Sequence, residues 1–355
     1  MRFNHALLLK IGLGCLIVSG CVSSLGVSYA QSKNSRENNP HKAAVTVTGA
    51  GSSFAAPVYE SWGEAAFPNI NVHVNYQTIG SSAGQDQVME GTIDFGASDK
   101  PMDEAGLKKA ALYQFPTVMS GVVVIVNVPH IVKGTLQLDG PTLAGIYDGT
   151  ITKWNDASIL ALNPGLKLPD DDIVPIHRAD GSGTSYVFTS YLSQLSSEWK
   201  KQIGAGTLVE WPGGAGARGN DGIAALVKQT EGSIGYVEFS YATGNHLDVA
   251  KLKNHDGVFI APTLESLSAA SQAADWQNSP NFTVNLLDQA GPNAWPIVSA
   301  TYALIPQKNI NTAEGKGVKS FFQWGLSHGE ELNSALGYVG LPHDVKMAIL
   351  EKWPG

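Results

Sequence analysis

The sequence predicts an α/β fold, and three observations carry that prediction. Short apolar strands alternate with segments of helical periodicity over most of the 355 residues, which is typical of sheets flanked by helices. Four of the strands end in a Gly/Ser/Thr turn that opens the next helix. Finally, 43% of the residues are apolar, enough for a large core, and the length corresponds to about two domains.

The expected elements follow in order along the chain. Strands are predicted at 43–51, 70–80, 93–99, 120–129, 172–181, 233–242 and 295–305, and helices at 52–67, 81–91, 100–112 and 183–192. Pro57 falls in the first turn of its helix, where proline is tolerated. The repeated order of strand then helix favours mainly parallel sheets.

The first thirty residues have the layout of a secretory signal peptide. Arg2 and Lys10 precede an apolar run, and "SSLGVSYA" ends in a small-x-small pattern at Ala30. Two interpretations stay open: cleavage after Ala30, or lipidation of Cys21, because "VSGC" resembles a lipobox. An uncleaved membrane anchor is disfavoured, since the apolar run is short and broken by Gly and Ser. The polar segment 31–43 is predicted to be a flexible leader.

Charge and cysteine content narrow the class of the exported protein. Both cysteines, Cys15 and Cys21, lie within the signal segment, so no disulfide is expected in the exported domain. Losing Arg2 and Lys10 with that segment changes the formal net charge from −8 to −10. Such an acidic, soluble protein is not expected to bind nucleic acid or anionic membrane surfaces.

Four turns nevertheless have the composition of an anion site. They are "TGAGSSF" (48–54), "IGSSAG" (79–84), "FGASDKP" (95–101) and "RADGSGTS" (178–185). The carboxyl ends of parallel strands line one edge of a sheet, where ligands bind. Each helix N-terminus offers unpaired N–H groups, and small side chains let an oxyanion approach them. An acidic protein can therefore hold an anion through local dipoles.

Arg178 adds a full positive charge to this expected site. Its planar guanidinium suits the oxygens of phosphate or sulfate, and Asp180 is well placed to orient it. The hydroxyls of Ser53, Ser81, Ser182 and Thr184 are further candidate donors.

Simpler interpretations compete for each residue taken singly. A Gly/Ser turn before a helix is usually an N-cap, and Asp99 could cap the helix around Met102–Leu112. Arg178 and Asp180 could form a surface pair, Phe54 could be a core residue, and His177 is expected to be structural. The coincidence of four such turns at four strand ends favours a shared site.

Two rival motifs are weaker. "GAGSSF" opens like a dinucleotide fingerprint, but Phe54 replaces the third glycine and no ribose-binding acid follows. "GSSAG" (80–84) fits the nucleophile elbow of a serine hydrolase with Ser82 as nucleophile, yet too few strands precede it and no His-Gly-Gly motif is present. The nine histidines have no paired spacing that predicts a metal site.

The turns lie within longer motifs that resemble a known family. These are "TGAGSSFAAPVYESW", "DFGASDKPM", "QFPTVMSGVVVIVN", "LDGPTLAGIYDGTITKWND", "RADGSGTSYVFTSYL" and "GNDGIAALV" with "GSIGYVE". Together they resemble the periplasmic phosphate-binding proteins of Pst-type ABC transporters, from about residue 45 to the C-terminus.

This resemblance implies a two-lobed, type II solute-binding protein of the α/β class, with inorganic phosphate in the interlobe cleft. Lobe 1 would comprise 44–118 with 290–355, and lobe 2 would comprise 119–289. The implied protein is a periplasmic monomer, not an enzyme, which needs no cofactor or metal. It delivers phosphate to the membrane permease subunits of the transporter.

The resemblance also implies the binding residues. They are Ser52, Ser53 and Phe54 in the first turn, Ser81 in the second, Asp99 in the third, and Arg178, Asp180, Ser182, Gly183 and Thr184 in the fourth. Ser53 stands where many members carry threonine, and the hydroxyl is kept.

Asp99 is the residue that separates phosphate from its main rival, sulfate. A carboxylate facing an anion is favourable only if the anion brings a proton, which phosphate does near neutral pH and sulfate does not. The resulting mismatch would reject sulfate by ~10⁴–10⁵. A sulfate receptor, or less plausibly a secreted hydrolase or phosphatase using Ser82, remains the alternative function.

Overall fold

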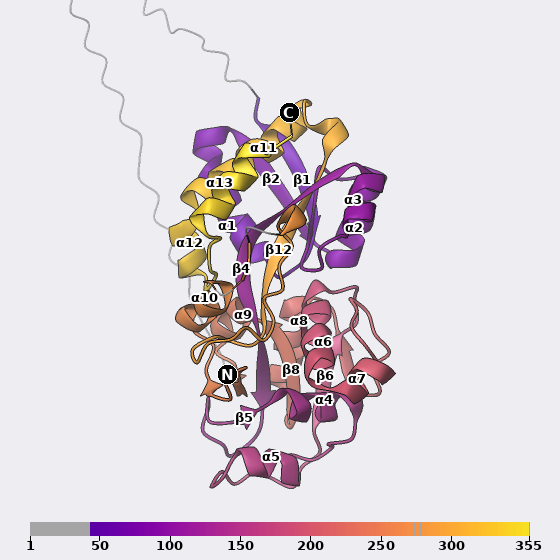
Figure 1. Ribbon diagram of the computed structural model, residues 1–355, viewed down its shortest axis with the longest axis vertical. Coiled ribbons are helices and arrows are strands. Elements are labelled where there is room, and N and C mark those ends of the chain that lie inside the picture. The colour runs from indigo at the N-terminus through magenta and orange to yellow at the C-terminus, as the bar shows by residue number, and fades with distance from the viewer. Residues whose placement is uncertain (1–42, 273, 277–278, 355) are drawn as a thin grey trace, which may run out of the picture. The chain divides into compact units, whose positions relative to one another are not determined.

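The computed structural model describes residues 43–272, 274–276 and 279–354 (Figure 1). The predicted signal peptide 1–30, Cys21 within it, and all but the last residue of the leader 31–43 lie outside these residues. The described chain forms one compact unit that begins at Ala43.

Helices and strands alternate through the first half of the chain, as the sequence predicts. Their bounds are β1 Val45–Gly51, α1 Ala56–Ile70, β2 Val72–Thr78, α2 Ser81–Glu90, β3 Phe95–Ser98, α3 Glu104–Ala110, β4 Leu112–Asn127, β5 Gln137–Leu138, α4 Gly140–Asp148, α5 Ala157–Leu162, β6 Val174–Arg178, α6 Gly183–Leu195 and α7 Ser197–Gln202.

The second half is less regular. It contains β7 Ala215–Ala217, α8 Gly219–Gln229, β8 Ser233–Glu238, α9 Phe239–Gly244, β9 Asp248–Val249, β10 Lys251–Lys253, β11 Phe259–Ile260, α10 Leu264–Gln272, the 3-10 turns Pro280–Phe282 and Gln307–Asn309, β12 Val298–Pro306, α11 Ala313–His328, α12 Glu330–Ala335 and α13 His343–Glu351.

The main sheet has the order β2-β1-β3-β12-β4-β8-β6-β7, with β9 also pairing β4. The prediction of mainly parallel strands holds only toward its two ends, where β1 pairs β2 and β3, and β6 pairs β7 and β8, all in parallel. At the centre, β12 and β4 pair antiparallel with each other and with their outer neighbours. The fold is a mixed α/β fold because each of the two central strands runs against both of its neighbours.

Strand β4 joins the two ends of this sheet. Its first part, through Gly121, pairs with β12, and from Val122 onward it pairs with β8. The sequence predicts this strand only over 120–129, whereas it begins at Leu112 and includes Pro116. The ladder has a register shift between Thr301 and Tyr302, opposite Val118 and Pro116. Such an irregularity accommodates a residue that has no N–H to donate.

One predicted strand is shorter than expected. The segment 233–242 alternates like a strand, but β8 ends at Glu238 and the next six residues form α9. The Glu238 side chain accepts a hydrogen bond from the amide of Ser240, which caps the new helix.

Helices cover both faces of the sheet and create the core that positions the site (Figure 1). Helices α1 and α11 pack together over β1 and β2, and α2 packs on β1 and β3. Between α1, β3 and α11, the rings of Tyr59, Trp62, Phe95, Phe321 and Phe322 form a buried aromatic cluster. The N-terminal ends of α1 and α2 are thereby fixed next to the carboxyl ends of β1 and β3.

Candidate anion-binding site

The four predicted turns meet at one place in the structure. Ser52, after β1, donates a 2.6 Å hydrogen bond to Asp99 after β3. Gly183, at the start of α6, lies so close to Asp99 that a Cβ there would be 2.4 Å from both its Oδ2 and the Ser81 hydroxyl. Segments separated by more than 80 residues therefore share one buried centre.

All ten sequence-predicted residues are buried at this centre. They are Ser52, Ser53, Phe54, Ser81, Asp99, Arg178, Asp180, Ser182, Gly183 and Thr184. Nine of them are polar or glycine, which is unusual for a protein interior and requires that each polar atom have a partner.

Arg178 and Asp180 form a buried ion pair, not the surface pair that a simple interpretation would give. The Nε and Nη2 atoms of Arg178 donate to the two Asp180 oxygens at 2.7 and 2.5 Å, and only 2% of Arg178 is exposed. Burial by itself would raise the pKa of Asp180, but the guanidinium holds it below the usual range. The bidentate pairing fixes the plane of the guanidinium and leaves Nη1 on the side of Thr184, 3.5 Å from its hydroxyl.

Asp99 is held by hydroxyl groups. Its Oδ2 accepts from Ser52 and its Oδ1 accepts from Thr301, both at 2.6 Å, while its amide donates to Ser81 at 3.3 Å. Asp99 is 1% exposed, and burial raises the pKa of its carboxyl to about 6 against these hydrogen bonds and the nearby Arg178. Asp99 does not cap the following helix; Asp103 does, by accepting from the amide of Gly106 at 2.7 Å.

The turn 52–54 is fixed from both sides. The amide of Phe54 donates to the Ser52 hydroxyl at 2.9 Å, and the fully buried Phe54 ring belongs to the core, as the simple interpretation expects. The carbonyl oxygens of Ser53 and Phe54 accept from the hydroxyls of Tyr241 and Tyr338, at 2.8 and 2.6 Å.

Helix α6 begins in the same cluster. The hydroxyl of Ser182 accepts from the Ser185 amide at 3.0 Å, so this side chain is an N-cap. The amides of Gly183 and Thr184, at the first two helical positions, have no acceptor within the helix. Glycine is required at 183 by the close approach of Asp99 and Ser81.

Sequence reasoning missed Asn220 and Thr301, whose side chains form hydrogen bonds with side chains of the predicted residues. Asn220, at the start of α8, donates from its backbone and side-chain nitrogens to the Ser53 hydroxyl at 3.2 and 3.0 Å. It lies in "GNDGIAALV", one of the motifs that carry the resemblance, and the glycine before it was the available signal. Thr301, in β12, gives no local signal, because its partner Asp99 is 202 residues away.

A second buried acid, Glu238, lies behind the turn 52–54. Its Oε1 accepts from Ser120 at 2.6 Å, and its Oε2 accepts from Ser240 and lies 2.9 Å from the Tyr338 hydroxyl, which donates its single proton to Phe54. Burial raises the pKa of Glu238 to about 7. The amide of Glu238 donates to Asn220 at 3.0 Å, which connects this acid to the hydrogen-bond network of the site.

The raised pKa of Glu238 predicts how stability depends on pH. Folding raises the carboxyl pKa of Glu238 from 4.5 to about 7, so its contribution is fully present below pH 4.5 and is lost as the pH rises through 7. We expect the difference in free energy of unfolding between wild type and Glu238→Gln to fall by about 1 kcal/mol per pH unit between pH 5 and 7. Urea unfolding at several pH values measures it, and a difference independent of pH would contradict the expectation.

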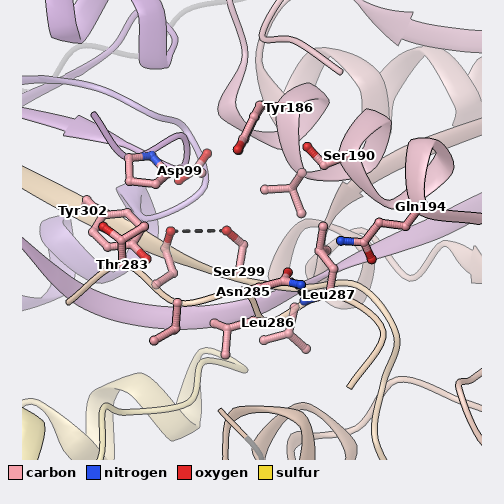
Figure 2. A pocket seen from close by; sticks show the side chains of 15 residues that line it. Asp99, Tyr186, Ser190, Gln194, Thr283, Asn285, Leu286, Leu287, Ser299 and Tyr302 are labelled. Carbon is pink, nitrogen blue, oxygen red and sulfur yellow. Dashed lines mark hydrogen bonds between the residues drawn. The ribbon is translucent and has the colours of Figure 1, made fainter. Parts of the chain in front are cut away.

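A cavity of about 390 Å³ reaches Asp99 (Figure 2). Of the ten predicted residues only Asp99 lines it. The hydroxyls of Tyr186 and Ser190 from α6 lie on one side, and Thr283, Asn285 and β12 on the other. It is an adjoining space rather than the centre where the four turns meet.

Ser82 does not have the surroundings of a hydrolytic nucleophile. Its hydroxyl donates to Thr207 at 3.0 Å, and its amide donates to the carbonyl of Gly181 at 3.0 Å.

His177, as expected, is structural: its ring stacks on Trp211 and lies 3.2 Å from the carbonyl oxygen of Arg178.

Metal clusters and membrane-spanning helices are both absent from the described residues. Within 43–272, 274–276 and 279–354, no cluster of three or more His, Cys, Asp or Glu side chains could hold a metal ion. In the same part of the chain no helix has the length and apolar character needed to cross a bilayer.

The fold and the buried polar site together define a two-lobed α/β solute-binding protein of type II. The PBP superfamily domain matches residues 37–328. Among solved structures, a phosphate-binding protein from Stenotrophomonas maltophilia is 21% identical and covers 88% of this chain and 95% of its own, with a TM-score of 0.65. A high-affinity periplasmic phosphate-binding protein bound with phosphate is 18% identical over 86% of this chain and 93% of its own, with a TM-score of 0.69.

Curated relatives are closer in sequence. A phosphate-binding protein PstS from Xylella fastidiosa is 42% identical over 341 residues, covering 95% of this chain and 94% of its own. Another from Haemophilus influenzae is 44% identical, covering 88% of this chain and 94% of its own. This chain belongs to the PstS family.

Proposed function

We propose that this protein binds inorganic phosphate outside the cytoplasm and delivers it to the permease of an ABC transporter for import. The names of its relatives support this function, and no step of it requires enzymatic chemistry. Arg178 would supply the positive charge, with the amides of Gly183 and Thr184 and the hydroxyls of Ser53 and Ser81 as donors. The amide of Phe54 would exchange its hydrogen bond to Ser52 for one to phosphate.

Asp99 is the observation that favours phosphate over other oxyanions. It is a buried acid whose two oxygens each accept one hydroxyl hydrogen bond at 2.6 Å, and it forms no ion pair with the described residues. Each carboxylate oxygen can accept a further hydrogen bond. Phosphate supplies the proton for it at neutral pH and sulfate does not, so the sulfate-receptor alternative is disfavoured.

Calorimetric titration of the purified protein tests this proposal. We expect phosphate to bind in the micromolar range or more tightly, since direct hydrogen bonds to charged groups contribute ~1.5–3 kcal/mol each. Arsenate, which is protonated like phosphate, should bind too. Absence of heat with either anion would overturn the proposed function.

We further infer that the protein works as two lobes, 44–118 with 290–355 and 119–289. This is supported by the change of partner along β4, from β12 to β8, between Gly121 and Val122. The turns 48–54, 79–84 and 95–101 then belong to one lobe and 178–185 to the other.

Lobe closure gives a prediction of its own. The contacts of Ser82 with Gly181 and Thr207 cross the proposed boundary and support a state in which the two lobes can close on the ligand. We expect phosphate to reduce the radius of gyration in small-angle scattering as the lobes close on it. Identical scattering with and without phosphate would argue for a permanently closed site.

The periplasm is the location that these features support. The segment 1–30 would direct export, and Cys21 would carry a lipid anchor if the lipobox interpretation holds. The partners would be phosphate and the permease subunits, with no nucleic acid, and the protein would act as a monomer.

The hydrolase alternative is tested at Ser82. We expect Ser82→Ala to change phosphate affinity by less than about 3-fold, because only one partly buried hydrogen bond, to Thr207, is lost. Neither the wild type nor the variant should hydrolyse p-nitrophenyl esters or phosphates. Hydrolysis by the wild type that the variant lacks would instead support the nucleophile interpretation.

A further inference from the structure

We propose that Thr301 is the positioning residue that keeps Asp99 selective for a protonated oxyanion. The inference rests on the proposed phosphate-binding function. It adds to the site a residue from β12 that lies outside all four predicted turns.

The position of Thr301 is set by the sheet. Thr301 is fully buried, and its Oγ1 donates to Asp99 Oδ1 at 2.6 Å. It lies immediately before the register shift of the β12–β4 ladder. Such irregularities re-aim a side chain relative to a regular strand. Its carbonyl oxygen accepts a 3.0 Å hydrogen bond from Thr117 in β4, which fixes the backbone at this point.

Two hydroxyl groups donate hydrogen bonds to the Asp99 carboxylate, one to each oxygen. Ser52 donates to Oδ2 and Thr301 donates to Oδ1. A hydrogen bond donated to a carboxylate stabilises the ionised form, which can only accept. With both donors present, Asp99 offers lone pairs to a ligand proton and repels an oxygen that carries none.

Removing the Thr301 hydroxyl would shift this balance. Asp99 is surrounded by protein: Arg178 is the nearby cation, and the buried hydroxyls of Tyr59 and Tyr76 lie within electrostatic range. Burial already raises the pKa of Asp99 to about 6. Without one of its donors the carboxyl would be protonated at higher pH, and a protonated carboxyl can donate to an oxygen of sulfate.

The test uses Thr301→Val, which removes the hydroxyl and nearly keeps the shape, with phosphate and sulfate affinities measured at pH 6, 7 and 8.5. Thr301→Ser keeps the hydroxyl. Thr142→Val is the matched control, because Thr142 is a buried threonine of α4, in the other proposed lobe from Thr301. If Thr301→Val does not fold, Thr301→Ala replaces it.

We expect Thr301→Val to lower the phosphate-to-sulfate affinity ratio at least ~10-fold at pH 6 and 7, with recovery at pH 8.5 as Asp99 ionises. Thr301→Ser and Thr142→Val should keep the wild-type ratio at each pH. A wild-type ratio in Thr301→Val at all three pH values, or an equal loss in Thr142→Val, would overturn the inference. Failure of the wild type to bind phosphate would instead overturn the proposed function.

Discussion

Replacing Arg178 with alanine is expected to weaken phosphate binding by at least ~2 kcal/mol, or roughly 30-fold in the dissociation constant. The substitution removes a cation that is 2% exposed and would face a desolvated anion. It also leaves the buried Asp180 without its bidentate partner, and an unpaired buried carboxylate is strongly unfavourable next to an anion.

Two variants control for the loss of charge in this measurement. Arg178→Lys keeps the charge but cannot form two parallel hydrogen bonds with Asp180, so we expect it to rescue binding poorly. Arg218→Ala removes an exposed arginine and should leave affinity nearly unchanged. Unchanged phosphate affinity in Arg178→Ala by calorimetry would contradict the site assignment.

Asp99→Asn is expected to change selectivity far more than phosphate affinity. Asparagine can accept the phosphate proton through its carbonyl oxygen, or turn its amide group toward an unprotonated oxygen. The hydroxyls of Ser52 and Thr301 can rotate to accept from the new amide, which keeps the side chain in place. We expect sulfate affinity to rise ~100-fold or more, a large part of the discrimination that an unpaired buried polar group provides.

Competition by sulfate and arsenate against labelled phosphate measures this effect. Arsenate should compete in both proteins, because its protonation resembles that of phosphate. If sulfate competes no better in Asp99→Asn than in the wild type, Asp99 is not the group that accepts a hydrogen bond from the ligand proton.

The part of the site that can be predicted is the part that local sequence patterns indicate. Each turn carries its own signal, a strand that ends in Gly, Ser or Thr before a helix, so Ser52, Ser81 and Gly183 could be found singly. Their meeting at Asp99 follows from the general rule that strand ends share an edge. The pairing of Arg178 with Asp180 is also expected from their spacing, but the sequence leaves open whether the pair is buried or at the surface.

The remainder depends on long-range packing. Thr301 reaches Asp99 only because β12 pairs antiparallel with β3 and β4, a topology that the alternating pattern does not reveal. The early start of β4 was missed because Pro116 argues against a central strand, and the register shift opposite it has no sequence signature. The strand pattern of 239–242 was overridden by the Glu238 cap.

The central claim is that Asp99 selects phosphate because phosphate brings a proton. It is tested most directly by titrating wild-type protein with phosphate and with sulfate at pH 8, where Asp99, with its pKa of about 6, is ionised. We predict tight phosphate binding and sulfate binding weaker by a factor of ~10⁴ or more. Sulfate affinity within about tenfold of phosphate affinity would contradict the account.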